Sequence, residues 1–136
     1  MFSKPKAGWV DINIGDYTIS ASYLTDIPMD FLNSLINSLE NNLPFSVFID
    51  EEGIENLLCA YYDKVFIIIM NGSNVEYKKI DMDFNTFRAE IVKDIEIYLN
   101  DWIDWNMKDD PKMLKSREIE LRNKLSIVKE KMLLEN

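Results

Sequence analysis

Residues 65–72, VFIIIMNG, place six consecutive apolar residues directly before an Asn-Gly pair. An unbroken apolar run of this length is typical of a strand at the centre of a sheet, where both faces are covered. Asn71-Gly72 favours the tight turn of a β-hairpin, because both residues tolerate positive φ. This stretch therefore predicts a fully covered central strand that is followed by a hairpin.

The neighbouring segments extend this hairpin into a meander of four strands. Residues 45–49 and 54–61 predict two strands before the central one, and residues 75–80 predict one strand after it. The turn Asp50-Glu51-Glu52-Gly53 joins the first two, since its glycine can adopt positive φ. Residues 8–24, which alternate around Gly15-Asp16, predict a separate N-terminal hairpin.

Helical spacing of apolar residues marks the rest of the chain. One helix is expected after the Thr25-Asp26 cap, a second over about residues 85–106, and a third after Pro111. The resulting order, ββα-ββββ-αα, predicts an α+β fold. We expect an antiparallel sheet of about six strands with the helices packed on one face.

Charge divides the 136-residue chain into two parts. Residues 1–107 hold 7 Lys and Arg against 18 Asp and Glu, whereas residues 108–136 hold 8 against 6. We expect an acidic α+β domain over 1–107 and a C-terminal amphipathic helix over 108–136. Leu114, Leu121 and Val128 recur at intervals of seven in that helix, which docks on the domain or pairs with a second copy.

The chain contains no histidine and a single cysteine, and this composition excludes several classes of enzyme. Ser-His-Asp and Cys-His arrangements are impossible, as is a zinc site of the common kinds. The four glycines lie in separate turns, so there is no phosphate-binding loop. We expect no catalytic activity and no cofactor, and we expect Cys59 to be a small buried apolar residue.

Residues 81–85, DMDFN, have the spacing that opens a calcium-binding loop. Such a loop also needs glycine at its sixth position and glutamate at its twelfth, where this chain has Thr86 and Val92. The stretch therefore predicts the end of a strand running into a helix cap.

Two acidic clusters are the candidate sites for protein binding. Their residues are Asp50, Glu51, Glu52 and Glu55 in the first, and Asp101, Trp102, Asp104 and Trp105 in the second. Carboxylates attract a basic partner, and tryptophan adds contact area and cation–π attraction. The simpler interpretations are a solvated turn for the first cluster and a core helix that buries two indoles for the second.

The net charge of −9 also constrains the partner. An acidic body attracts basic proteins and repels nucleic acid and anionic lipid. The alternative is that the net negative charge only keeps a cytoplasmic protein soluble. No apolar run approaches the roughly 20 residues that cross a bilayer, and the N-terminus does not resemble a secretory signal. We therefore expect a cytoplasmic protein that binds neither nucleic acid nor membrane.

A resemblance to a known family is carried by the order ββα-ββββ-αα, the excess of acidic residues, and the segments 22–28 (SYLTDIP) and 47–53 (VFIDEEG). In these features the chain resembles the small bacterial immunity-type proteins of polymorphic and contact-dependent toxin systems. The resemblance implies an inhibitor that neutralises a cognate toxin domain by binding it. Immunity families share no catalytic residues, so the resemblance assigns no catalytic role to any residue here.

The expected function is therefore non-catalytic protein binding through an acidic surface. A structural or regulatory adaptor that homodimerises through residues 112–134 is the alternative. A small-molecule binder with a pocket between sheet and helix also stays open at this level.

Overall fold

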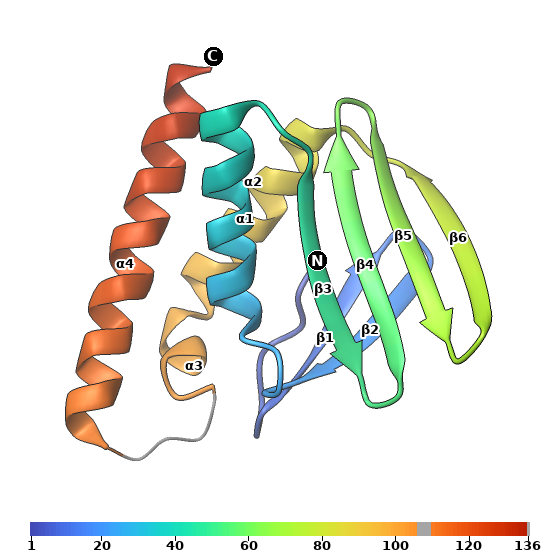
Figure 1. The fold of residues 1–136 in the computed structure, drawn as a ribbon. Coiled ribbons are helices and arrows are strands. Elements are labelled where there is room, and N and C mark those ends of the chain that lie inside the picture. The colour runs from blue at the N-terminus through green and yellow to red at the C-terminus, as the bar shows by residue number, and fades with distance from the viewer. Residues whose placement is uncertain (106–109, 136) are drawn as a thin grey trace.

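The computed structural model describes residues 1–105 and 110–135, and over these ranges it confirms the α+β class and the order of strands and helices (Figure 1). The strands are β1 (Trp9–Ile14), β2 (Tyr17–Ser22), β3 (Phe45–Glu51), β4 (Ile54–Tyr61), β5 (Lys64–Asn71) and β6 (Asn74–Asp81). The helices are α1 (Ile27–Asn41), α2 (Phe84–Ile97), α3 (Leu99–Ile103) and α4 (Pro111–Leu134).

The six strands form two antiparallel sheets rather than one. β1 pairs with β2, while β3, β4, β5 and β6 form a meander in chain order. Figure 1 shows the β1–β2 hairpin behind the four-stranded sheet, with the helices gathered beside it. Two polar contacts join the sheets: the Ser20 N–H donates to Glu51 Oε1 at 3.1 Å, and the Tyr17 hydroxyl donates to Asn56 Oδ1 at 3.1 Å.

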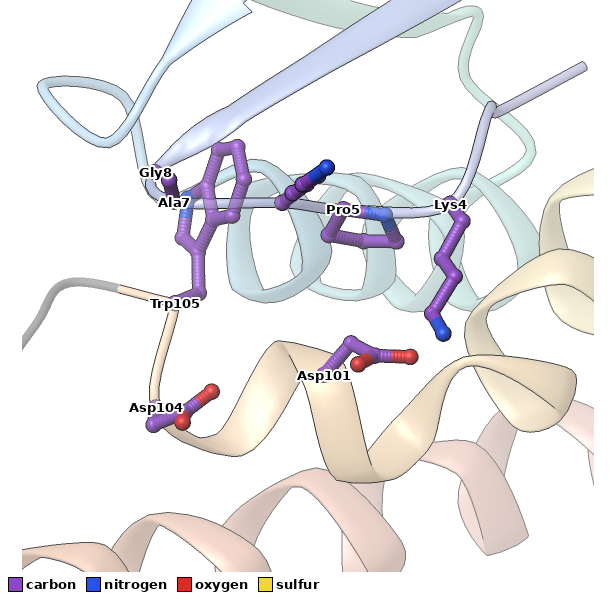
Figure 2. Close-up of a pocket in the computed structure, with 8 residues that line it drawn as sticks. Lys4, Pro5, Ala7, Gly8, Asp101, Asp104 and Trp105 are labelled. Atoms are coloured by element: carbon purple, nitrogen blue, oxygen red, sulfur yellow. The ribbon is translucent and has the colours of Figure 1, made fainter.

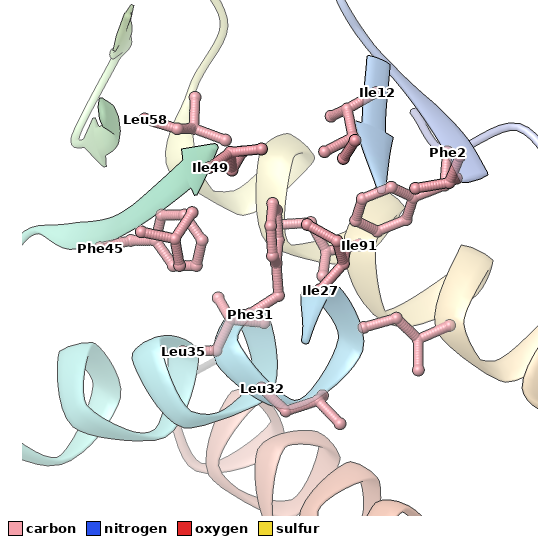
Figure 3. Packing of buried hydrophobic residues seen from close by; sticks show 14 of the residues in the cluster. Phe2, Ile12, Ile27, Phe31, Leu32, Leu35, Phe45, Ile49, Leu58 and Ile91 are labelled. Carbon is pink, nitrogen blue, oxygen red and sulfur yellow. The ribbon is translucent and has the colours of Figure 1, made fainter. Parts of the chain in front are cut away.

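The core lies between the inner face of the four-stranded sheet, the hairpin and the helices (Figure 3). Alternate residues of β3 and β4 point into it, among them Phe45, Ile49 and Leu58. Phe31 of α1 packs against Phe45 with ring centroids 5.5 Å apart, and Phe45 packs edge-on against a ring of α2. Aromatic packing therefore ties the sheet to both helices.

The prediction that both faces of the central strand are covered is wrong. Val65, Ile67 and Ile69 of β5 are buried, but Phe66 on the opposite face is 42% exposed. The hairpin, α1 and α2 lie against the other face, and nothing in the described chain covers this one (Figure 1). The apolar run of residues 65–70 is unbroken because the residues of β5 that point to the uncovered face are apolar as well.

The helix predicted over about residues 85–106 is divided into α2 and α3. Tyr98 breaks it with φ −100° and ψ 23°, and its N–H donates to Asp94 O at 3.1 Å. Neither glycine nor proline marks this position, so the sequence pattern continues across the break. The turn at Tyr98 sets the direction in which Trp102 enters the core.

Helix α4 packs along α1 and buries Leu121, Leu125 and Val128 (Figure 1). Its first turn is capped by Asp110, whose Oδ1 accepts from the Lys112 N–H at 2.9 Å, and Pro111 follows. The residues that would pair with a second copy are thus in contact with the chain's own core. The predicted boundary at 107/108 lies outside the described residues.

Arg117 holds the first part of α4 against the residues that precede α1 and against α3. Its two terminal nitrogens donate to both oxygens of Asp26 at 2.8 and 2.9 Å, and its Nε donates to the Trp102 carbonyl at 3.1 Å. A forked, charge-assisted contact of this kind fixes orientation as well as position. Within residues 1–105 and 110–135, no helix is long and apolar enough to span a membrane.

Candidate functional site

The β3–β4 turn presents three exposed carboxylates, those of Asp50, Glu52 and Glu55. Asp50 and Glu55 are direct cross-strand partners, so their side chains leave the same face of the sheet side by side. Among the described residues, none of the three forms an ion pair. This turn therefore offers uncompensated negative charge to a partner.

Glu51, the fourth acid predicted for this cluster, has a different role. It is half-buried, and its two carboxylate oxygens accept from the Ser20 N–H and from Asn56 Nδ2, at 3.1 and 3.3 Å. Burial, together with the Glu51 and Glu76 carboxylates, raises the pKa of Tyr17, whose hydroxyl donates to Asn56 Oδ1. Glu51 joins the two sheets rather than facing a partner.

An apolar row crosses the open face of the sheet beside these acids. Its members are cross-strand neighbours from β3 to β6, namely Phe48, Leu57, Ile68 and Tyr77. Phe48 is 53% exposed and Tyr77 is 76% exposed, and the two central residues are half-buried. We call these four residues the outer row. The unbroken apolar run of β5 is the sequence signal for the outer row, although such a run is also typical of a strand that is covered on both faces.

The second predicted cluster is divided between core and surface. Trp102 and Trp105 are 0% and 2% exposed and pack edge to face, with ring centroids 5.1 Å apart. The structure thus agrees with the core-helix interpretation of the two indoles, although Trp105 also lines a hollow at the surface. Asp104 remains exposed and Asp101 is half-buried.

Asp101 and Asp104 line a hollow of about 670 Å³ opposite the N-terminal segment 4–8 (Figure 2). Lys4 and Lys6 lie on the other side, and Figure 2 shows the Lys4 amine directed toward Asp101. Two cations therefore balance two carboxylates. Balanced charge gives this hollow no strong preference for either sign of ligand.

Thr25 connects the two acidic clusters. Its Oγ1 accepts from the Asp50 N–H at 3.4 Å, and its carbonyl accepts from Trp105 Nε1 at 3.3 Å. The loop that carries it also exposes Tyr23 and Leu24. The chain thereby brings both clusters to one end of the molecule. We call its five carboxylates the acidic end: Asp50, Glu52, Glu55, Asp101 and Asp104. Lys4 and Lys6 balance the last two, so the uncompensated charge of the acidic end is that of the first three.

The remaining sites that the sequence suggested have structural explanations. Asp83 caps α2, because its Oδ1 accepts from the Thr86 N–H at 2.7 Å, which confirms the predicted helix cap. Asp81 pairs with Lys64 at 3.2 Å. Cys59 is half-buried on the open face rather than in the core, and burial raises the pKa of its thiol.

Comparison of the chain with models of protein families, with curated proteins and with solved structures finds no match.

Proposed function

We propose that this protein is a non-catalytic binding domain that recognises a basic protein through the acidic end and the adjoining outer row. The observation that carries the proposal is the position of Asp50 and Glu55. Both carboxylates stand unpaired within the described chain, beside an uncovered apolar row. An apolar centre with a charged border is typical of a protein interface.

The geometry favours docking on the face of the sheet over addition of a strand to its edge. The free edge of β3 is occupied at Ser46, because Ser34 Oγ donates to the Ser46 carbonyl at 2.8 Å and accepts from the Ser46 N–H at 3.0 Å. At the other edge, β6 carries Lys78 and Lys79, and edge lysines discourage pairing with another strand.

The specific form that we propose is an immunity-type inhibitor that neutralises a cognate bacterial toxin domain. The resemblance of residues 22–28 and 47–53 to such proteins supports this form, and both segments border the acidic end. A toxin domain that acts on nucleic acid needs a basic surface. An acidic partner would cover that surface and block access to it.

The alternative of an adaptor that dimerises through residues 112–134 gains no support from a specific contact. The apolar stripe of α4 is already buried against α1.

Affinity capture with three baits tests the proposal. The first bait is the wild-type protein, and the second is the triple variant Asp50→Asn, Glu52→Gln, Glu55→Gln. The third is a charge-matched control, Asp16→Asn, Glu90→Gln, Glu130→Gln, whose acids form no ion pair within the described chain. We expect wild type and control to retain the same basic protein and the triple variant to lose it.

The captured protein is then purified and mixed with the wild type. A one-to-one complex that abolishes the activity of a toxin supports the immunity-type form. A partner held equally well by the triple variant contradicts the role of the acidic end.

A further inference from the structure

A second hollow, of about 440 Å³, lies at the end of the sheet away from the acidic end. It opens where α1 ends, α2 begins and the chain reaches its C-terminus, at the top of Figure 1. Tyr61, Tyr62, Phe84, Arg88 and Glu135 are among the residues that line it. Its volume is within the range of about 300–1,000 Å³ that small-molecule sites occupy.

Arg88 is the chemically distinctive residue of this hollow. Its side chain is only 4% exposed, and its guanidinium Cζ lies 5.3 Å from the centre of the Phe84 ring. Its Nη1 donates to Glu135 Oε2 at 2.6 Å, while its Nε has no partner among the described residues. A buried guanidinium requires an anion beside it, because desolvation of an unpaired charge is costly.

The anion that satisfies Arg88 comes from a weakly packed part of the chain. Glu135 follows the last residue of α4 and is 46% exposed at its side chain. Leu133 and Leu134 before it are both largely exposed, so little apolar burial holds this last turn. The Arg88–Glu135 contact can therefore open at a small cost in apolar packing.

The rim of the hollow is strained. Tyr62 adopts a left-handed backbone with φ 56°, which is unfavourable for a bulky aromatic residue. Its carbonyl accepts from the Phe84 N–H at 2.6 Å, and this contact holds the β4–β5 turn against α2. The Tyr61 and Tyr62 rings lie with centroids 4.1 Å apart. Strain of this kind accumulates at binding sites, where surrounding contacts maintain it.

We propose that Arg88 anchors a small carboxylate with a flat apolar body, and that Glu135 is an internal occupant which this ligand displaces. The guanidinium binds the carboxylate through its fork of donors, and the aromatic side chains receive the apolar body. Asp63 also lines the hollow, but its carboxylate pairs with Lys64 at 3.1 Å. This site is independent of the acidic end.

Titration of the ¹⁵N-labelled protein with benzoate tests the proposal, with the Arg88 Nε–H resonance as the probe. We expect Glu135→Gln to bind benzoate about tenfold more tightly than wild type, because removal of an internal competitor raises the fraction of open sites. Glu130→Gln, on the exposed side of the same helix, should bind as wild type does. Benzamide, which lacks the charge, should bind to none of them.

Arg88→Met removes that probe, so its titration is followed through the backbone amide resonance of Phe84, which lines the same hollow. Benzoate should leave this resonance unchanged, while the far-UV circular dichroism of the variant stays native. If that variant fails to fold, the comparison of Glu135→Gln with Glu130→Gln still decides the question. Equal affinity of Glu135→Gln and wild type, or no binding to either, would overturn the proposal. The Arg88–Glu135 ion pair would then have only the structural role of holding the end of α4 against α2.

Discussion

Asp50 and Glu55 are direct cross-strand partners on β3 and β4, and neither carboxylate forms an ion pair within residues 1–105 and 110–135. Like charges that are direct cross-strand partners are unfavourable, while opposite charges are favourable. Glu55→Lys should therefore raise the free energy of unfolding by about 0.2–1 kcal/mol, measured by urea denaturation at low salt. The same change should weaken partner binding. A loss of stability would contradict the surface position of this pair.

Trp102 and Trp105 belong to the core in this structure, and their substitution should show it. Trp102→Ala should cost about 3–5 kcal/mol in the free energy of unfolding, as large core truncations do. Leu24→Ala, at an exposed position in the neighbouring loop, should change it by less than about 0.5 kcal/mol. Similar small effects for both variants in urea denaturation would show that the indole is not in the core.

Cys59 reports directly on the open face of the sheet. Burial raises the pKa of its thiol above the ordinary value, so less thiolate is present at neutral pH than for a free cysteine. Alkylation by iodoacetamide should be slow near pH 7 and should accelerate as pH rises toward the shifted pKa. A thiol that reacts faster than free cysteine at neutral pH would contradict the buried environment.

At the scale of whole elements, α4 depends on the forked contact of Arg117 with Asp26. Arg117→Lys keeps the charge but loses the fork and the bond to the Trp102 carbonyl. The free energy of unfolding should fall by about 1.5–3 kcal/mol, the usual contribution of hydrogen bonds to charged groups. Arg122→Lys is the matched control, since among the described residues Arg122 pairs with the nearby Glu118 of its own helix and with no other acid. That variant should cost less than about 0.5 kcal/mol.

The elements were largely predictable from sequence, because periodicity and turn residues act locally. The β3–β4 and β5–β6 turns lie where Gly53 and Gly72 indicate, and Asp83 caps α2 as expected. The break at Tyr98 was not predictable, since no residue type marks it. The division of six strands into two sheets depends on distant contacts, such as that between Ser20 and Glu51.

The candidate sites were predictable only in part. An apolar run does not distinguish a covered strand from one with an open apolar face, so β5 was misinterpreted and the outer row was missed. The sequence indicates the site at Arg88 only weakly. Its one sign there is a cationic residue next to the buried positions 87, 91 and 95 of α2. Its partner Glu135 lies 47 residues away in sequence. No local pattern connects the two.

At the scale of the whole molecule, the charges and the fold act together. The chain carries a net charge of −9, and the acidic end places five of its carboxylates around a single connection at Thr25. The open face of the sheet begins at the same end, since Asp50 and Glu55 belong to both surfaces. In the function that we propose, the same residues attract a basic partner and orient it toward the apolar contacts.

The association rate of the captured partner, measured against ionic strength, tests this attraction most directly. Between about 0.05 and about 0.5 M salt, the rate for wild type should fall at least tenfold, because salt screens exposed charges. The rate for the Asp50, Glu52, Glu55 triple variant should start low and change little. A wild-type rate that is independent of salt, or equal rates for the two proteins at low salt, would contradict recognition through the acidic end.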